Sequence, residues 1–157
     1  MAEAQLPAEG SLGTGRDDVQ LRFRDDDMAP GAQVTVDAFL EQDDATAVRI
    51  EPGDDARDLL PHLARIRLVE INFPTFADGR GYSAARVLRE EGYDGEIRAV
   101  GDVLVDQIGY MRRCGFDAFA PERPLDEADV KAAFARFPYV YQSAGDDAVP
   151  IWNLRHG

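Results

Sequence analysis

The sequence predicts an α/β fold in which about four consecutive β-α units form a small parallel sheet flanked by helices. From residue 46 onward, short β-prone runs alternate with segments of helical apolar period, and the connections between them are short. Strands of such units pair in parallel through right-handed crossovers, with helices expected on both sides of the sheet. Because four units are half of an eight-fold barrel, half of a (βα)8-type barrel, pairing with itself, is the alternative.

Two weaker elements precede the regular pattern. Residues 19–23 alternate apolar and polar side chains, which predicts an edge strand, and an acidic turn follows them. Residues 34–41 are ambiguous between strand and helix, and we favour a helix.

The four units follow in order. Each strand is a β-prone run closed by a turn, glycine or proline, and the strands are expected at 46–50, 67–73, 96–100 and 116–120. Each helix has an apolar stripe at three- and four-residue spacing, and the helices are expected at 54–65, 81–91, 102–114 and 126–137. Asp102 and Asp126 are the expected caps of the last two helices, and Gly115 is the expected end of the third.

The chain divides into three parts by composition. Residues 1–18 are expected to be a flexible leader, residues 19–142 a single α/β domain, and residues 143–157 a C-terminal tail. No apolar run approaches the roughly 18–20 residues that cross a bilayer, and no secretory signal is visible. A single cysteine suits a reducing compartment. We therefore expect a cytoplasmic protein.

The 157 residues include 30 acidic and 17 basic ones, for a net charge of −13. Such a surface repels nucleic acid and anionic membranes, so we expect neither as a partner. The charge is uneven: residues 1–66 carry 15 acids and 6 bases, a net −9, whereas residues 67–125 carry 10 acids and 8 bases. The nearly neutral, arginine-rich middle segment leaves room for a small oxyanion.

Ligands of parallel α/β folds gather at the carboxyl ends of the strands. The most informative loop there is 78–83, where two glycines flank an arginine directly before a helix, so backbone amides and a guanidinium can face an anion. A helix start with a local ion pair is the alternative. The expected ligand-binding residues are Gly79, Arg80, Gly81, Tyr82, Ser83, Asp102 and Arg123, and the candidates for proton transfer are Asp78, Tyr82 and Asp102.

A second row of polar residues follows on the next helix. Asp106, Tyr110 and Arg113 share one face, which predicts either a partner contact or a solvated ion-pair face. Cys114, in the last turn, has no second cysteine to pair with, so its reactivity stays open. The strand-end aspartates are candidate Mg²⁺ ligands, but we expect no metal site.

The stretch from Phe73 to Phe119 carries a specific signature. Its blocks are Phe73-Pro74 with 78–83, then 98–107, then 112–119, with further likeness at 141–142 and 150–152. It resembles a bacterial family of unknown function whose members are labelled oxidoreductases of sulfite reduction and are encoded beside assimilatory sulfite reductase and phosphoadenylyl-sulfate reductase. The resemblance covers roughly residues 46–142 and implies a pathway rather than a catalytic residue.

The chain shows no G-x-G-x-x-G or G-x-x-x-x-G-K-[ST] motif, so we expect no redox cofactor of its own. The expected function is an accessory protein of sulfate and sulfite reduction that binds a small oxyanion or docks on one of these reductases. The alternatives are an oxidoreductase component that borrows a cofactor and a structural subunit. Homo-oligomerisation stays open.

Overall fold

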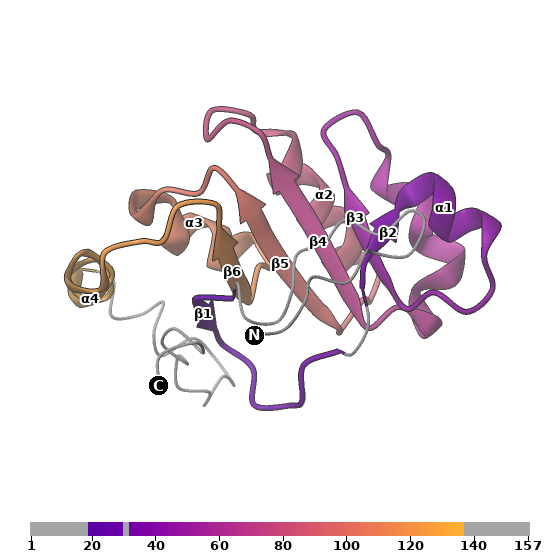
Figure 1. Ribbon diagram of the computed structural model, residues 1–157, viewed down its shortest axis with the longest axis horizontal. Helices are drawn as coiled ribbons and strands as arrows, with labels where there is room; N and C mark the ends of the chain where they lie inside the picture. Colours follow the sequence, from indigo (N-terminus) through magenta and orange to yellow (C-terminus); the bar gives the residue numbers. More distant parts are fainter. Residues whose placement is uncertain (1–18, 30–31, 137–157) are drawn as a thin grey trace, which may run out of the picture.

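The computed structural model describes residues 19–29 and 32–136, which form a six-stranded sheet packed against helices (Figure 1). The strands are β1 (Leu21–Arg22), β2 (Val34–Thr35), β3 (Ala47–Ile50), β4 (Leu68–Phe73), β5 (Glu96–Gly101) and β6 (Ala118–Pro121). The helices are α1 (Val36–Glu41), α2 (Arg80–Glu90), α3 (Ile108–Cys114) and α4 (Glu127–Arg136), with 3-10 helices η2 (Ala56–Arg65) and η3 (Val105–Gln107). The predicted α/β class, with a mostly parallel sheet flanked by helices, is confirmed.

The strand order is β1-β6-β5-β4-β3-β2. Strands β2 to β6 are parallel neighbours in chain order, and β1 is antiparallel to β6. Right-handed crossovers that always step in one direction put their helices on one face of the sheet. Leu88 of α2 and Met111 of α3 accordingly share one core with Ile71 and Phe119 of the sheet. Helices were expected on both sides, but α2 and α3 both lie behind the sheet in Figure 1.

Alternate residues of each strand face the two sides of the sheet. In β4, Val69, Ile71 and Phe73 belong to the core on the helix side, so Glu70 and Asn72 face the other side. No helix residue of the described ranges belongs to the apolar clusters of that other side, which we call the helix-free face. It carries the polar residues that interrupt the apolar runs of the strands.

Five charged side chains of the helix-free face form a row of alternating sign, which we call the charge ladder. Glu96 lies between Arg22 and Arg98, at 3.0 and 3.1 Å, and Glu70 lies between Arg98 and Arg49, at 3.1 and 2.8 Å. Four of the side chains are at most 3% exposed, and Arg49 is 13% exposed. Burial of these charges is compatible with folding because each interior member has an opposite charge on both sides.

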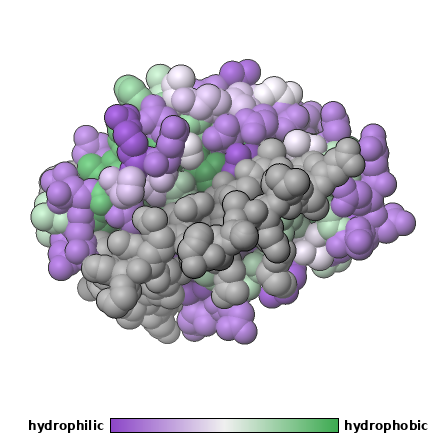
Figure 2. All heavy atoms as spheres, in the orientation of Figure 1, coloured by the Kyte–Doolittle hydropathy of each residue, from purple (hydrophilic) through white to green (hydrophobic). Residues whose placement is uncertain are grey.

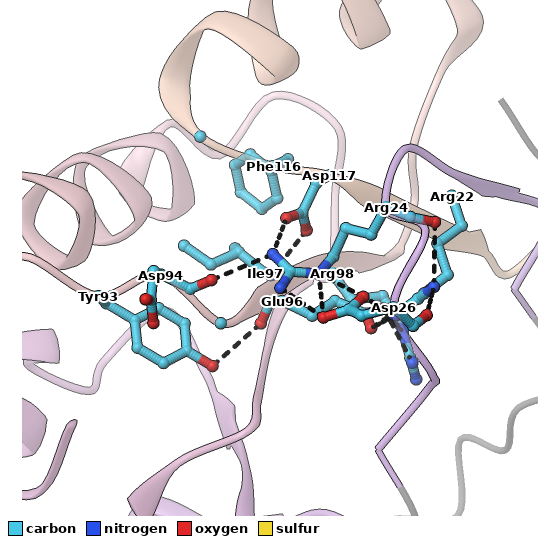
Figure 3. Close-up of polar contacts among 12 residues, drawn as sticks. Arg22, Arg24, Asp26, Tyr93, Asp94, Glu96, Ile97, Arg98, Phe116 and Asp117 are labelled. Carbon is cyan, nitrogen blue, oxygen red and sulfur yellow. Dashed lines mark hydrogen bonds and ion pairs between the residues drawn. The ribbon is translucent and has the colours of Figure 1, made fainter. Parts of the chain in front are cut away.

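A second polar cluster lies at the amino end of β5 and ties the first described strand to the sheet (Figure 3). The carboxylate of Asp117 accepts hydrogen bonds from the Ile97 amide at 2.9 Å, from Arg24 at 2.9 Å and from Arg89 at 3.1 Å. Burial nevertheless raises the pKa of Asp117 above its usual value. Arg24 binds both Asp117 and Asp26, and its contact with Asp117 anchors the chain after β1 to this end of the sheet.

Two helices begin or wind differently from the prediction. The segment 56–65 is a 3-10 helix with Pro61 inside it, and proline has no amide proton to donate to a helical bond. The third predicted helix begins at η3 rather than at Asp102, whose side chain binds the loop after β4 instead. The predicted cap at Asp126 and the predicted helix end at Gly115 are confirmed.

The predicted leader at 1–18 and the predicted tail at 143–157 lie outside the described residues. Within the described ranges, no helix has the length and the apolar composition that crossing a membrane requires. On the face drawn in Figure 2, hydrophilic side chains make up most of the described surface, and hydrophobic ones show only in small areas.

Candidate functional site

The loops after β4, β5 and β6 are bonded to one another at the carboxyl edge of the sheet. The amide of Asp102 donates to the Phe73 carbonyl at 2.7 Å, and the amide of Glu122 donates to the Gly101 carbonyl at 2.7 Å. Gly101 has a φ of +93°, and a Cβ there would overlap the Phe73 carbonyl oxygen. At the predicted location of the site, backbone hydrogen bonds therefore hold the three loops against one another.

Arg80 is paired within its own loop. Its Nη2 lies 2.8 Å from Asp78, whose other oxygen accepts from the Arg80 amide and Nε. These hydrogen bonds from Arg80 lower the pKa of Asp78 to about 2, and the carboxylate raises the pKa of Arg80. The Arg80 side chain is 66% exposed, and its Nη1 makes no hydrogen bond within the described ranges. One edge of the guanidinium is thus oriented by Asp78, and the other faces solvent.

Arg80 and Ser83 lie on a hollow of about 250 Å³ at the starts of η2 and α2, together with Arg57. We call it the arginine hollow. Arg57 is 72% exposed, and its Nε lies 3.2 Å from Asp55. Asp55 is also the cap of η2, and the Arg57 amide and side chain lower its pKa. The hollow therefore combines two exposed guanidinium groups with carboxylates that orient them.

The two glycines of the 78–83 loop differ in role. A Cβ on Gly81 would lie 2.5 Å from the Phe73 ring and 2.9 Å from a methyl group of Ile71, so Gly81 permits close packing of α2 on β4. A Cβ on Gly79 would meet nothing within 4 Å. The steric need for glycine at position 81 comes from the core.

Tyr82 points away from the arginine hollow. Its hydroxyl accepts a hydrogen bond from Gln107 at 2.9 Å, and its ring packs 5.4 Å from that of Phe73. Burial raises the pKa of Tyr82. Gln107 also donates to the Phe76 carbonyl at 2.8 Å, so it links the β4 loop to α2. Sequence reasoning did not identify Gln107, because its partner lies 31 residues away in the chain.

Asp102 and Arg123 meet each other, but they do not line the arginine hollow. Asp102 accepts from the Phe76 amide at 3.0 Å, and its other oxygen lies 3.9 Å from Arg123. Arg123 is 85% exposed. Among the predicted ligand-binding side chains, the structure brings Arg80 and Ser83 to one hollow, and Asp102 and Arg123 to a neighbouring contact.

The predicted partner face centres on Tyr110, which is 43% exposed. The Arg113 guanidinium lies 5.8 Å from the Tyr110 ring centre, and Arg86 of α2 donates to its hydroxyl at 2.9 Å. Asp106 is also exposed. Cys114, in the next turn of the chain, is buried. We call Asp106, Tyr110, Arg113 and Arg86 the tyrosine face.

A hollow of about 300 Å³ opens at the carboxyl ends of β3 to β6. We call it the strand-end hollow; its walls include Arg49, Asn72, Gly101 and Glu122. Sequence reasoning did not identify this site. The signal was present, because Arg49 and Asn72 are polar residues at alternate positions of otherwise apolar strands, but their alignment depends on the register of the sheet.

The strand-end aspartates do not form a metal site. Within residues 19–29 and 32–136, no group of three or more His, Cys, Asp or Glu side chains is placed to hold a metal ion. Asp78 binds Arg80, and Asp102 binds the Phe76 amide.

A family model described as "Bacterial protein of unknown function (DUF934)" matches residues 47–152, more than half of the chain. The matched range begins at β3. It includes Arg57 and Arg80 of the arginine hollow, Arg49 and Asn72 of the strand-end hollow, and the tyrosine face. No curated protein and no solved structure matches the chain.

Proposed function

The chain belongs to the DUF934 family of bacterial proteins of unknown function, so we propose a role from its site. We propose that it is an accessory protein of sulfate and sulfite reduction that binds a small oxyanion in the arginine hollow. The likeness of the 73–119 signature to proteins labelled with sulfite reduction supports the pathway. The chemistry of the hollow supports the ligand class.

The observation that carries the proposal is that Arg57 and Arg80 line one hollow. Within the described part of the chain, the Nη1 of Arg80 and both terminal nitrogens of Arg57 make no hydrogen bond. Guanidinium groups bind tetrahedral oxyanions through two or more parallel N–H donors. The Ser83 hydroxyl on the same hollow adds one further donor.

The carboxylates of Asp55 and Asp78 have two opposing effects on an anion. They fix the two guanidinium groups, which lowers the entropic cost of binding, and they reduce the local positive potential. In a chain of net charge −13, the second effect makes the affinity modest and sensitive to ionic strength.

The proposal assigns the electron transfer to a partner. The sequence has a single cysteine, which is buried, and no nucleotide-binding glycine motif. An accessory protein would instead deliver or sense the oxyanion for a reductase.

Thermal-shift titration at low ionic strength with sulfite, sulfate, adenylyl sulfate and phosphoadenylyl sulfate tests this function. We expect at least one of the four to stabilise the protein, and Arg80→Ala and Arg57→Ala to remove most of that stabilisation. The matched control is Arg67→Ala, which removes an exposed arginine at the amino end of β4, away from the arginine hollow. No stabilisation by any of the four anions, or the same loss in Arg67→Ala, would refute the proposal.

A second candidate function is docking on sulfite reductase or phosphoadenylyl-sulfate reductase through the tyrosine face. Exposed tyrosine with arginine packed on it is typical of the residues that dominate protein interfaces. Pull-down with each reductase tests it, with Tyr110→Ala expected to lower retention about tenfold. Leu40→Ala on α1 is the control, since Leu40 is 41% exposed. Equal retention of Tyr110→Ala and the unmodified protein would exclude this docking surface.

A further inference from the structure

We propose that the arginine hollow binds an organic sulfate or sulfonate, in which a singly charged oxyanion is attached to a compact apolar group, in preference to inorganic sulfate. This inference rests on the proposed oxyanion function and narrows it to one class of ligand. Three features of the hollow support it: the composition of its lining, its size and the balance of charge around it.

The side of the hollow that α2 provides changes from polar to apolar along the helix. Its residues are Arg80, Ser83, Ala84 and Val87. They recur at positions i, i+3, i+4 and i+7, so they lie on one face of α2. Seven residue steps of about 1.5 Å give this face a length of about 10 Å. A ligand that extends along it meets N–H and O–H donors at one end and methyl groups at the other.

Apolar residues outside α2 enlarge the apolar part of the lining. Pro52, in the turn after β3, and Ala56, at the start of η2, both line the hollow. Ala84 and Val87 pack on the hydrophobic core and are still partly exposed, so part of their surface is available to a ligand. Apolar walls with a few polar groups are typical of small-molecule sites. An inorganic oxyanion would leave these walls in contact with water.

The hollow is also larger than an inorganic oxyanion requires. Its volume is about 250 Å³, close to the lower limit of about 300 Å³ for sites that enclose small organic molecules. Sulfate or sulfite fills only part of this space, whereas an oxyanion that carries a ring or a short chain fills more of it. The size of the hollow therefore favours an oxyanion with an organic substituent.

Both guanidinium groups of the hollow are already paired with carboxylates. Arg57 lies 3.2 Å from Asp55, and Arg80 lies 2.8 Å from Asp78. Asp54 adds a further carboxylate to the lining, and it makes no ion pair within the described ranges. The hollow therefore has no excess of positive charge, and an anion is held there by the remaining N–H donors of the two arginines.

This balance of charge favours a monoanion. Sulfate esters and sulfonates carry one negative charge, whereas inorganic sulfate carries two and phosphate monoesters carry nearly two above about pH 7. The second charge of a dianion gains no additional cation in the hollow and is repelled by Asp54. Charge and size thus select the same class of ligand, a sulfo group on a compact apolar body.

Nuclear magnetic resonance titration of the full chain at about pH 8 and low ionic strength tests the inference with four probes: phenyl sulfate, inorganic sulfate, phenyl phosphate and phenol. Inorganic sulfate lacks the apolar group, phenyl phosphate carries the second charge, and phenol lacks the oxyanion. We expect phenyl sulfate to shift the backbone amides of Ser83 and Val87 and to bind at least tenfold more tightly than each of the other three. Equal binding of phenyl sulfate and any one of them would overturn the inference.

Val87→Thr tests the apolar end, because it replaces one methyl group by a hydroxyl and keeps the branched shape of the side chain. We expect it to weaken binding of phenyl sulfate about fivefold and to leave binding of inorganic sulfate unchanged. Val105→Thr on η3 is the matched control, since Val105 is also a partly buried valine on the same core but does not line the hollow. Equal affinities of the two variants for phenyl sulfate would contradict the apolar contact.

Arg80→Ala separates this inference from the proposed oxyanion function. We expect it to weaken binding of phenyl sulfate at least tenfold. If inorganic sulfate binds through Arg80 and phenyl sulfate binds no more tightly, the inference is wrong and the oxyanion function stands. If phenyl sulfate binds equally well to Arg80→Ala, or if neither this titration nor the thermal-shift titration gives a response, both are wrong.

Discussion

Arg98 and Glu70 form an ion pair of 3.1 Å inside the sheet, with side chains that are 2% and 0% exposed. Glu96 binds the other side of Arg98 at 3.1 Å. The guanidinium therefore joins two neighbouring strands on the helix-free face. Charges buried in this way are stable only while every partner is present.

Arg98→Met is accordingly expected to destabilise the protein by about 3–5 kcal/mol, because it leaves two buried carboxylates with one arginine fewer. Urea unfolding followed by circular dichroism measures the change. The control is Arg67→Met, which replaces an exposed arginine directly before β4. Its free energy of unfolding is expected to stay within about 0.5 kcal/mol of that of the unmodified protein. If Arg98→Met lowers the free energy of unfolding by less than about 1 kcal/mol, the prediction is wrong, and the charge ladder relaxes or admits water.

Gly81→Ala tests whether the loop glycine serves packing. A helical glycine-to-alanine change usually stabilises by up to about 1 kcal/mol. Here the new methyl group would lie 2.5 Å from the Phe73 ring, so we expect a net loss of about 1–3 kcal/mol in the free energy of unfolding. Gly79→Ala, where a Cβ meets nothing within 4 Å, is expected to be close to neutral. Similar stabilities of the two variants would contradict the packing role.

Asp102→Ala is expected to loosen the loop after β4. The variant loses the acceptor of the Phe76 amide, and a net hydrogen bond of about 1 kcal/mol predicts roughly fivefold faster exchange of that amide. Asp102→Asn retains a side-chain oxygen and is expected to preserve most of the protection. Arg123→Ala, which removes only a contact of 3.9 Å, serves as the control. Unchanged exchange at Phe76 in Asp102→Ala would show that the backbone contacts alone hold the loop.

Asp26 predicts a specific acid dependence. The hydrogen bond from Arg24 lowers its pKa to about 2, against about 3.9 in an unfolded chain. A carboxyl whose pKa is lower in the folded state stabilises the fold above about pH 4, and this contribution disappears as the pH falls to about 2. Because the Asp26 side chain is 53% exposed, solvent screening reduces the contribution to about 0.5–1 kcal/mol.

Asp26→Asn should therefore lower the free energy of unfolding at pH 6 and change it little at pH 2. Urea unfolding at both pH values measures the difference. Asp25→Asn is the control, since the Asp25 side chain makes no hydrogen bond or ion pair within the described ranges. A destabilisation of Asp26→Asn that is equal at both pH values would assign the effect to packing instead of charge.

The order and type of most elements could be predicted from the sequence because their signals are local. The runs around Ile71 and Ile97 have strand composition, and Gly115 and Asp126 mark helix ends through backbone chemistry. The face that the helices cover was not predictable in this way, because it follows from the order of the strands. Pro61 alone did not reveal that its segment winds as a 3-10 helix.

The candidate site was predictable in part for the same reason. Arg80 and Ser83 are three residues apart, so their shared hollow follows from one loop and one helix turn. Arg49, Asn72 and Glu122 come from three elements and meet only when the register of the sheet is known. Their polar character within or beside strands was visible, but the sequence could not indicate which of them are neighbours.

The two outer strands of the sheet, β1 and β2, have two residues each. A row of unpaired amides and carbonyls invites addition of a strand from another molecule, and a short edge offers too few bonds for that addition to persist. β1 also runs antiparallel to β6, so it interrupts the parallel series at one margin. Within residues 19–29 and 32–136, both margins of the sheet therefore offer only short strands to which a strand of another molecule could add. For the described residues, this arrangement favours assembly through side chains over assembly through main-chain pairing.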